Sequence, residues 1–206
     1  MKTTLKIMTM AALFFAAGCT KDDDADSITI QEHDKNLMMG LMHQMMAKME
    51  ANPMTMDPDQ DFASMMKIHH QGAIDMANAE LKDGRDVTMK AMAQKIITAQ
   101  QAEITQLDAF LTSHSPHLMS MEFHDMMMAE MKTSGKQADL QIINGDIDHD
   151  FAILMTGHHH SAVESSRLEL IYGHENSMKS MSKNIIESQL TEINEFQDWL
   201  IARGNK

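Results

Sequence analysis

The sequence is poor in the residues that build disulfides, β-sheets and nucleic-acid surfaces. It has one cysteine, three prolines, one tryptophan and one tyrosine in 206 residues, against 25 methionines. A single cysteine cannot form an intramolecular disulfide, and the scarcity of aromatic residues argues against sheets, which favour them. Basic residues are also few, because 17 Lys and Arg face 30 Asp and Glu, and the formal net charge is -13. An acidic surface repels phosphates, so we expect no nucleic-acid partner.

Motifs for catalysis are absent as well. No Glu-x-x-His occurs, although the di-iron proteins of helical bundles carry this motif on two helices. The sequence also has no Gly-x-Ser-x-Gly and no glycine-rich loop that could cradle a phosphate. We therefore predict that the protein is not an enzyme.

The first residues have the pattern of an export signal. Two lysines precede an apolar run, residues 7–17, which is followed by Gly18 and Cys19. This run is too short to span a bilayer comfortably, and no later segment approaches about 20 apolar residues. The arrangement resembles the lipobox of bacterial lipoproteins, in which the cysteine becomes the lipid-modified N-terminus. We expect residues 1–18 to be a lipoprotein signal peptide, residues 19–35 a flexible acidic tether, and Cys19 the lipid anchor.

A plain secretory signal with an incidental cysteine is the alternative for this segment. The tether begins with residues 20–24, TKDDD, which resemble the Lys-plus-acidic signal that sends some Gram-negative lipoproteins to the cell surface. The sequence thus predicts a lipid-anchored protein of the cell envelope. Its expected place is the outer membrane, on the periplasmic side or at the cell surface.

An internal duplication organises the rest of the chain. Residues 61–70, DFASMMKIHH, recur as residues 150–159, DFAILMTGHH, at an offset of 89 that continues without a gap. Within each copy the apolar residues have helical spacing, and Gly84 and Gly173 separate two helical runs. We expect each glycine to take the left-handed conformation that often ends a helix. The expected helices span residues 59–82, 86–112, 148–172 and 175–202.

A shorter, methionine-rich helix is expected before each hairpin, at residues 36–51 and about 119–132. A helical hairpin alone leaves an apolar stripe exposed, so the two hairpins should pair. The expected fold is all-α, an antiparallel four-helix bundle of two duplicated hairpins. Its first unit covers residues 36–112 and its second covers residues 113–206.

Methionine and histidine recur on these helices at spacings of three and four residues, so their side chains share helix faces. Cu(I) and Ag(I) are soft cations that accept thioether sulfur and imidazole nitrogen in sites of low coordination number. The candidate ligands on the short helices are Met39, Met42, His43, Met45, Met46, Met49, His124, Met127, Met128 and Met131. Those on the hairpins are Met66, His69, His70, Met155, His158 and His159.

A repeated Gln-x-x-Glu sequence on the second helix of each hairpin ends in Glu103 and Glu192. A buried carboxylate needs a partner, and a histidine of the facing helix would supply one. We therefore expect these glutamates to support the histidines, with an exposed surface pair as the alternative. Adjacent histidines on a helix point about 100° apart, and the sequence does not tell which of each pair faces inward.

The sequence HHQGAIDMA at residues 69–77, with its trailing Gln-x-x-Glu, resembles the bacterial family of domains of unknown function numbered 305. The resemblance covers residues 61–111 closely and 150–200 more loosely. It implies a ferritin-like helical bundle, export, and binding of copper or silver by methionine and histidine. It also adds Met76 to the ligands of the first copy. Ser165 stands at the matching position of the second copy, which implies a weaker or structural site there.

The sequence therefore predicts a cell-envelope lipoprotein that sequesters or hands on Cu(I) or Ag(I). Two alternatives stay open. One is a ferritin-like redox enzyme with iron or manganese at His69, His70 and Glu103, and the other is a helical module that binds a protein through the methionine face of residues 38–49. Methionine also fills cores, so any single one can serve packing alone. The expected partners are metal ions and the membrane, with a homo-oligomer or a metal-delivery partner left open.

Overall fold

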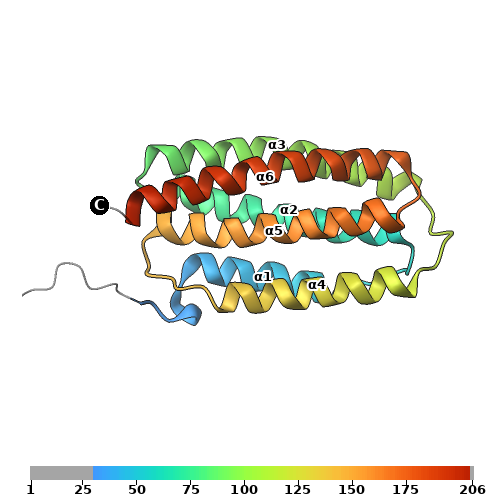
Figure 1. Cartoon of the computed structure of the whole chain (residues 1–206), viewed down its shortest axis with the longest axis horizontal. Helices are drawn as coiled ribbons and strands as arrows, with labels where there is room; N and C mark the ends of the chain where they lie inside the picture. The colour runs from blue at the N-terminus through green and yellow to red at the C-terminus, as the bar shows by residue number, and fades with distance from the viewer. Residues whose placement is uncertain (1–29, 205–206) are drawn as a thin grey trace, which may run out of the picture.

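Six α-helices follow one another in the computed structural model, which describes residues 30–204 (Figure 1). A short 3-10 helix, η1 (His33–Lys35), precedes them, and residues 30–204 contain no strand. The α-helices are α1 (Leu37–Glu50), α2 (Pro58–Asp83), α3 (Val87–Ser113), α4 (Met121–Asp139), α5 (Ile147–Tyr172) and α6 (Asn176–Gly204). The predicted all-α class is confirmed. None of the helices between residues 30 and 204 is both long enough and apolar enough to span a bilayer.

Side-chain caps fix where these helices begin. The residue before each of α1 to α5 accepts a hydrogen bond from a backbone N–H of the first helical turn. Such a cap pairs a donor that the helix itself leaves free. The capping residues are Asn36, Asp57, Asp86, Ser120 and Asp146.

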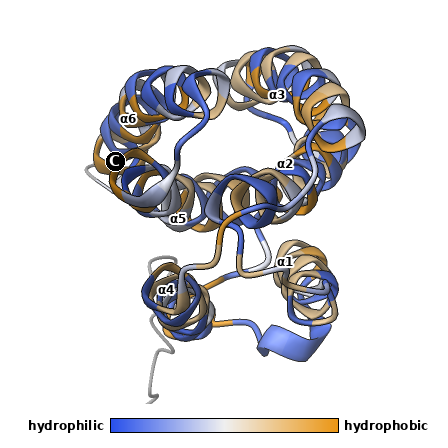
Figure 2. Ribbon diagram, turned by 90° about the vertical axis from the view of Figure 1, so that its right-hand side faces the viewer, coloured by the Kyte–Doolittle hydropathy of each residue, from blue (hydrophilic) through white to orange (hydrophobic). Residues whose placement is uncertain are grey.

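The helices form three layers of two, seen end-on in Figure 2. The hairpins α2–α3 and α5–α6 make a four-helix bundle in which α2 packs on α5, and α1 and α4 lie beneath it on α2 and α5. The start of α2 lies beside the end of α5, because Asp59 accepts the backbone N–H of His174, so these two helices are antiparallel. The predicted bundle of two duplicated hairpins, each preceded by a methionine-rich helix, is confirmed.

Methionine supplies much of the core between the lower layer and the bundle. Helix α1 buries Met38, Met39, Met42, Met45 and Met49. The close approach of α1 to α2 depends on Gly72, because a Cβ at that position would lie 2.6 Å from the Sδ of Met45. A sulfur-rich seam therefore runs between α1 and α2.

Gly84 and Gly173 follow the ends of α2 and α5, but the prediction of a left-handed conformation is wrong. Their φ angles are -65° and -66°, in the extended region that any residue adopts. Space is the reason for glycine here. A Cβ on Gly84 would lie 2.6 Å from the carbonyl oxygen of Glu80 and closer still to its carboxyl group, and Glu169 crowds Gly173 in the same way.

Glu80 links the first copy to the second. At the start of α5, Asp148 accepts the backbone N–H groups of Arg85 and Asp86, at 2.8 and 2.9 Å, where α3 begins. Glu80 is buried beside Asp148 and neither of its carboxyl oxygens has a donor, so the two carboxyl groups can share a hydrogen bond only when one carries a proton. Burial and the neighbouring Asp148 raise the pKa of Glu80 to about 8, so Glu80 is the protonated donor at neutral pH.

The second copy repeats this arrangement in reverse. Asp59 at the start of α2 accepts the backbone N–H groups of His174 and Glu175, at 2.9 and 2.8 Å, before α6. Glu169 is buried beside Asp59 without a hydrogen-bond donor, and burial together with that neighbour raises the pKa of Glu169 to about 10. Each copy therefore holds the interhelical turn of the other.

The end of the predicted tether packs against the protein. The backbone N–H of Gln31 donates to the carbonyl oxygen of Ile143 at 2.9 Å, and His33 Nε2 lies 3.0 Å from the carbonyl oxygen of Gln141. Residues 31–35 therefore contact the loop between α4 and α5 instead of forming a free tether. The predicted signal peptide and Cys19 lie outside the described residues.

Candidate metal centre

The first histidine of each repeated pair lies where α2 faces α5. His69 and His158 are buried, and their rings stack with centroids 3.6 Å apart and 21° between planes. No protein group hydrogen-bonds to the ring nitrogens of either residue. Burial, reinforced by the neighbouring histidines, lowers the pKa of both well below the usual value. Both rings are therefore neutral, and each has a nitrogen lone pair that can bind a cation.

The second histidine of each pair faces the other helix of its own hairpin. The distance from His70 Nε2 to Glu103 Oε2 on α3 is 2.8 Å, and His159 Nε2 lies equally close to Glu192 Oε2 on α6. Burial raises the pKa of Glu192, but the hydrogen bond and charge of His159, helped by Lys95, outweigh that effect and leave the pKa lowered. The carboxylates proposed from the sequence thus orient the second histidines, and the first histidines remain without a partner.

A small inner cavity lies beside His69 at the junction of α1, α2, α4 and α5. Its volume is about 10 Å³, near the minimum that one water molecule requires. It is lined by Met49, Phe62, Met65, Met66, His69, Met127 and Ser165, all of them buried. Four methionines and one neutral histidine therefore line a space the size of one small ion, and the sulfur of Met65 also accepts a hydrogen bond from Asn52 at 3.5 Å.

A difference between the two copies explains why this cavity exists. Ser165 lines it, whereas Met76, at the same position of the first copy, is a fully buried core residue. Serine has a shorter side chain than methionine. Ser165 on α5 therefore leaves a space that the side chain of Met76 fills at the matching position of α2. From the sequence we expected Ser165 to weaken a site in the second copy. The structure places it in the wall of a cavity whose histidine belongs to the first copy.

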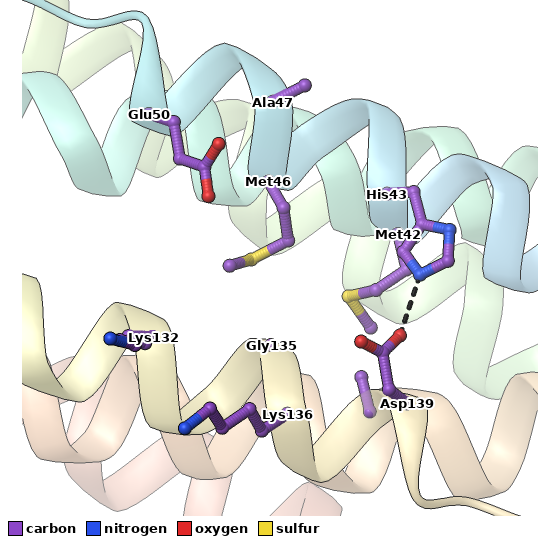
Figure 3. A pocket seen from close by; sticks show the side chains of 10 residues that line it. Met42, His43, Met46, Ala47, Glu50, Lys132, Gly135, Lys136 and Asp139 are labelled. Carbon is purple, nitrogen blue, oxygen red and sulfur yellow. Dashed lines mark hydrogen bonds and ion pairs between the residues drawn. The ribbon is translucent and has the colours of Figure 1, made fainter.

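An outer groove of about 310 Å³ runs between α1 and α4 (Figure 3). Met42 and Met46 point their side chains from α1 into this groove. The exposed His43 lies at its edge, with Nε2 2.8 Å from Asp139 Oδ1. The groove therefore offers soft donors within reach of solvent, beside the acidic side chain of Glu50.

The remaining predicted ligands line neither the cavity nor the groove. Five of them are buried methionines whose position is explained by core packing: Met39, Met45, Met76, Met131 and Met155. On α4, His124 and Met128 are partly buried. Of the predicted ligands on the methionine-rich helices, three thus line the groove and two line the cavity, and most of the other sulfur atoms pack the core.

Met65, Ser165, Asp139 and Glu50 line the cavity or the groove but were not predicted as site residues. Met65 had a usable signal, because it lies four residues before His69 on the same helix face. Ser165 and Asp139 had none. Neither has the chemistry of a soft donor, and their positions follow from how helices distant in sequence pack together.

The histidine pairs do not form a cluster of nitrogen and carboxylate donors. Between residues 30 and 204, a single group of three His, Cys, Asp or Glu side chains brings its ligand atoms within 4.8 Å of one another, and it lies at the loop between α3 and α4. His69, His70 and Glu103, the iron or manganese ligands of the alternative redox enzyme, are not such a group. The rings of the two histidines are 6.3 Å apart and face different helices.

Comparison with known proteins gives one family and several similar folds. The profile of the family described as Domain of unknown function (DUF305) matches residues 4–111 and again residues 59–200. CopM in the Cu(I)-bound form is 26% identical over 68% of this chain and 94% of CopM, with a TM-score of 0.52. A DUF305 protein from Streptomyces coelicolor is 23% identical over 73% of this chain and 96% of that one, with a TM-score of 0.58. No curated protein sequence matches the chain.

Proposed function

Since the chain belongs to the DUF305 family, we propose that it binds Cu(I) or Ag(I) in the cell envelope and sequesters or hands on the ion without catalysis. The observation that carries this proposal is the inner cavity, which Met49, Met65, Met66 and Met127 line together with the neutral His69. CopM, whose fold is similar, has been determined with Cu(I) and with silver bound.

The donors of the cavity favour soft cations of low charge. Thioether sulfur and neutral imidazole are uncharged ligands that suit polarisable monovalent cations. No carboxylate lines the cavity, so a hard divalent cation would lose its hydration shell without gaining a compensating charge. The low pKa of His69, caused first by its burial, keeps the ring available as a ligand at neutral pH. Unlike thiols, these donors do not form disulfides in an oxidising compartment.

The outer groove is suited to exchange of the ion with solvent or with a delivery partner. Met42, Met46 and the exposed His43 offer soft donors there. Lys132 and Lys136 offset the acidic groups of Glu50 and Asp139 in this groove, so the attraction of cations comes from the net charge of -13. We therefore assign capture and release to the groove, and retention to the buried cavity.

Titration of the protein with Ag(I) or Cu(I) against a competing chelator tests this proposal. The variant Met49→Leu/Met127→Leu keeps apolar bulk and removes two sulfur atoms from the cavity. We expect its affinity to fall at least about tenfold, or ~1.4 kcal/mol. The control is Met89→Leu/Met178→Leu, which removes two buried sulfur atoms that do not line the cavity. Unchanged affinity in the first variant, or equal losses in both, would contradict the proposal.

The lipid anchor rests on the N-terminal sequence and needs its own experiment. Cys19→Ser should move the protein from the membrane fraction to the soluble fraction of cells. Mass spectrometry of the mature wild-type N-terminus should show a diacylated Cys19. A wild-type protein that fractionates as soluble, with an unmodified cysteine, would refute the anchor and leave the metal proposal standing.

A further inference from the structure

A cluster of harder donors lies where the loop between α3 and α4 folds back onto the start of α2. Asp57, the capping residue of α2, is fully buried, and the His114 side chain is 6% exposed. The His117 side chain, 52% exposed, completes the cluster from the loop. One ligand atom from each residue lies within 4.8 Å of the others. This cluster takes no part in the soft-metal centre.

The spacing of these atoms suits a shared metal ion, although both nitrogens also make long hydrogen bonds of 3.3 Å, His114 Nε2 with Asp57 and His117 Nδ1 with the carbonyl oxygen of Ser115. His114 Nε2 lies 3.3 Å from Asp57 Oδ1, and His117 Nδ1 lies 3.6 Å from Asp57 Oδ2. A hydrogen bond between such atoms is shortest and strongest at about 2.9 Å. Two ligands of a tetrahedral ion, with bonds of about 2.0–2.1 Å, are about 3.3 Å apart. Modest closure of the exposed His117 would bring all three residues onto one ion.

The surroundings hold the first two donors in place. The Asp57 carboxylate accepts backbone N–H groups from Gln60 at 3.1 Å and from His117 and Leu118 at 3.0 Å.

The ring of His114 is fixed from both sides. Phe110 stacks on it with centroids 4.6 Å apart. Its other nitrogen, Nδ1, lies 3.8 Å from Glu175 Oε1. That distance is too long for a hydrogen bond, whereas Nε2 hydrogen-bonds to Asp57 Oδ1 at 3.3 Å, so an ion held between these two atoms would replace the proton of that bond.

The duplication supplies an internal comparison. At the offset of 89, Asp57 corresponds to Asp146 and His114 corresponds to Arg203. In the second copy Arg203 Nη2 pairs with Asp146 Oδ2 at 2.5 Å, and a guanidinium cannot bind a metal. The second copy therefore holds a permanent cation at this position, in a pair that is 40% exposed, whereas His114 and Asp57 are buried. The first copy instead has two imidazoles beside the same carboxylate.

We propose that Asp57, His114 and His117 bind one divalent cation of the borderline class, Zn(II) or Cu(II), at the end of the bundle opposite the N-terminus of α3. Two nitrogen ligands and one carboxylate oxygen suit these ions, and water completes the tetrahedron. The ion would tie the loop between α3 and α4 to the start of α2. This site is separate from the cavity at His69 in position and in donor chemistry.

Co(II) is the probe that reports this geometry, because its visible absorption is intense in a tetrahedral site. We expect one equivalent to bind to the purified protein with such a spectrum and to be displaced by Zn(II). His114→Arg copies the ion pair of the second copy, so the fold should persist while Co(II) affinity falls at least about tenfold. His117→Ala, at an exposed position, should weaken binding similarly.

The cavity variant Met49→Leu/Met127→Leu should keep the Co(II) spectrum, and His114→Arg should keep its Ag(I) affinity. The two sites can thus fail independently. An absent tetrahedral spectrum, or a spectrum and affinity unchanged in both His114→Arg and His117→Ala, would overturn the divalent site.

Discussion

Replacing Glu80 and Glu169 by glutamine should remove a steep dependence of stability on pH. Each glutamate is buried and acts as a protonated donor to an aspartate of the other copy. A glutamine amide can make the same hydrogen bond without a titratable proton. The substitution therefore keeps the contact to Asp148 or Asp59 and removes only the ionisation.

The sign and size of the effect follow from proton binding. The ordinary pKa of these glutamates is 4.5, and the folded values are about 8 for Glu80 and about 10 for Glu169. Between the two values the folded chain keeps a proton that the unfolded chain has lost. The free energy of unfolding therefore falls as pH rises, by up to about 1.4 kcal/mol per pH unit for each group. The contribution is complete below the unfolded pKa and is lost as pH rises through the folded one.

Urea unfolding at a series of pH values would measure this dependence as a difference between wild type and variant. Wild type and variant must be compared because His69 and His158 also make stability depend on pH. Burial lowers the pKa of both histidines, so near pH 6 they make the free energy of unfolding rise with pH. For Glu80→Gln the difference should change between pH 5 and about 8 and then level off. For Glu169→Gln the change should continue toward pH 10. A difference that is constant with pH, or that grows with opposite sign, would refute the paired carboxyl interpretation.

Two further predictions concern packing and exchange. Gly84→Ala should destabilise the protein by about 1–3 kcal/mol, because its Cβ would meet the backbone and carboxyl group of Glu80. Gly157→Ala, inside α5 with open space around its Cβ, should instead stabilise by about 0.5–1 kcal/mol in the same urea assay. Met46→Leu in the outer groove should slow the transfer of Ag(I) to a chelator in stopped-flow measurements while leaving equilibrium affinity within about twofold. Equal stability of the two glycine variants, or an unaltered transfer rate, would contradict these expectations.

Much of the fold could be predicted because local signals agree with it. The ends of α2, α3 and α5 follow from capping aspartates and from glycines after the last turn. Helix α4 was predicted to span about residues 119–132. The helix continues to Asp139, and a Cβ on Gly135 would lie 3.0 Å from the Cε of Met46. Glycine at position 135 therefore allows α4 to pack closely on α1, and this contact cannot be predicted from the local sequence.

The candidate site was less accessible to sequence reasoning. Helical spacing brings Met66 and His69 to one face of α2, and that much can be read from the chain. Which methionines of α1 and α4 reach the same point depends on the packing of the lower layer on the bundle. Met49 and Met127 do so, while Met45 and Met131 pack in the core. The cavity itself depends on the short side chain of Ser165, which carries no sign of metal chemistry.

X-ray absorption at the copper edge of the Cu(I)-loaded protein tests the soft-donor centre most directly, because it reports the atoms bound to the ion. We predict a first shell of sulfur with one imidazole nitrogen. In His69→Phe, which keeps an aromatic ring against His158, the nitrogen should be lost and sulfur retained. A shell of nitrogen and oxygen alone, or a spectrum that is the same in wild type and His69→Phe, would contradict a copper site built from these methionines and His69.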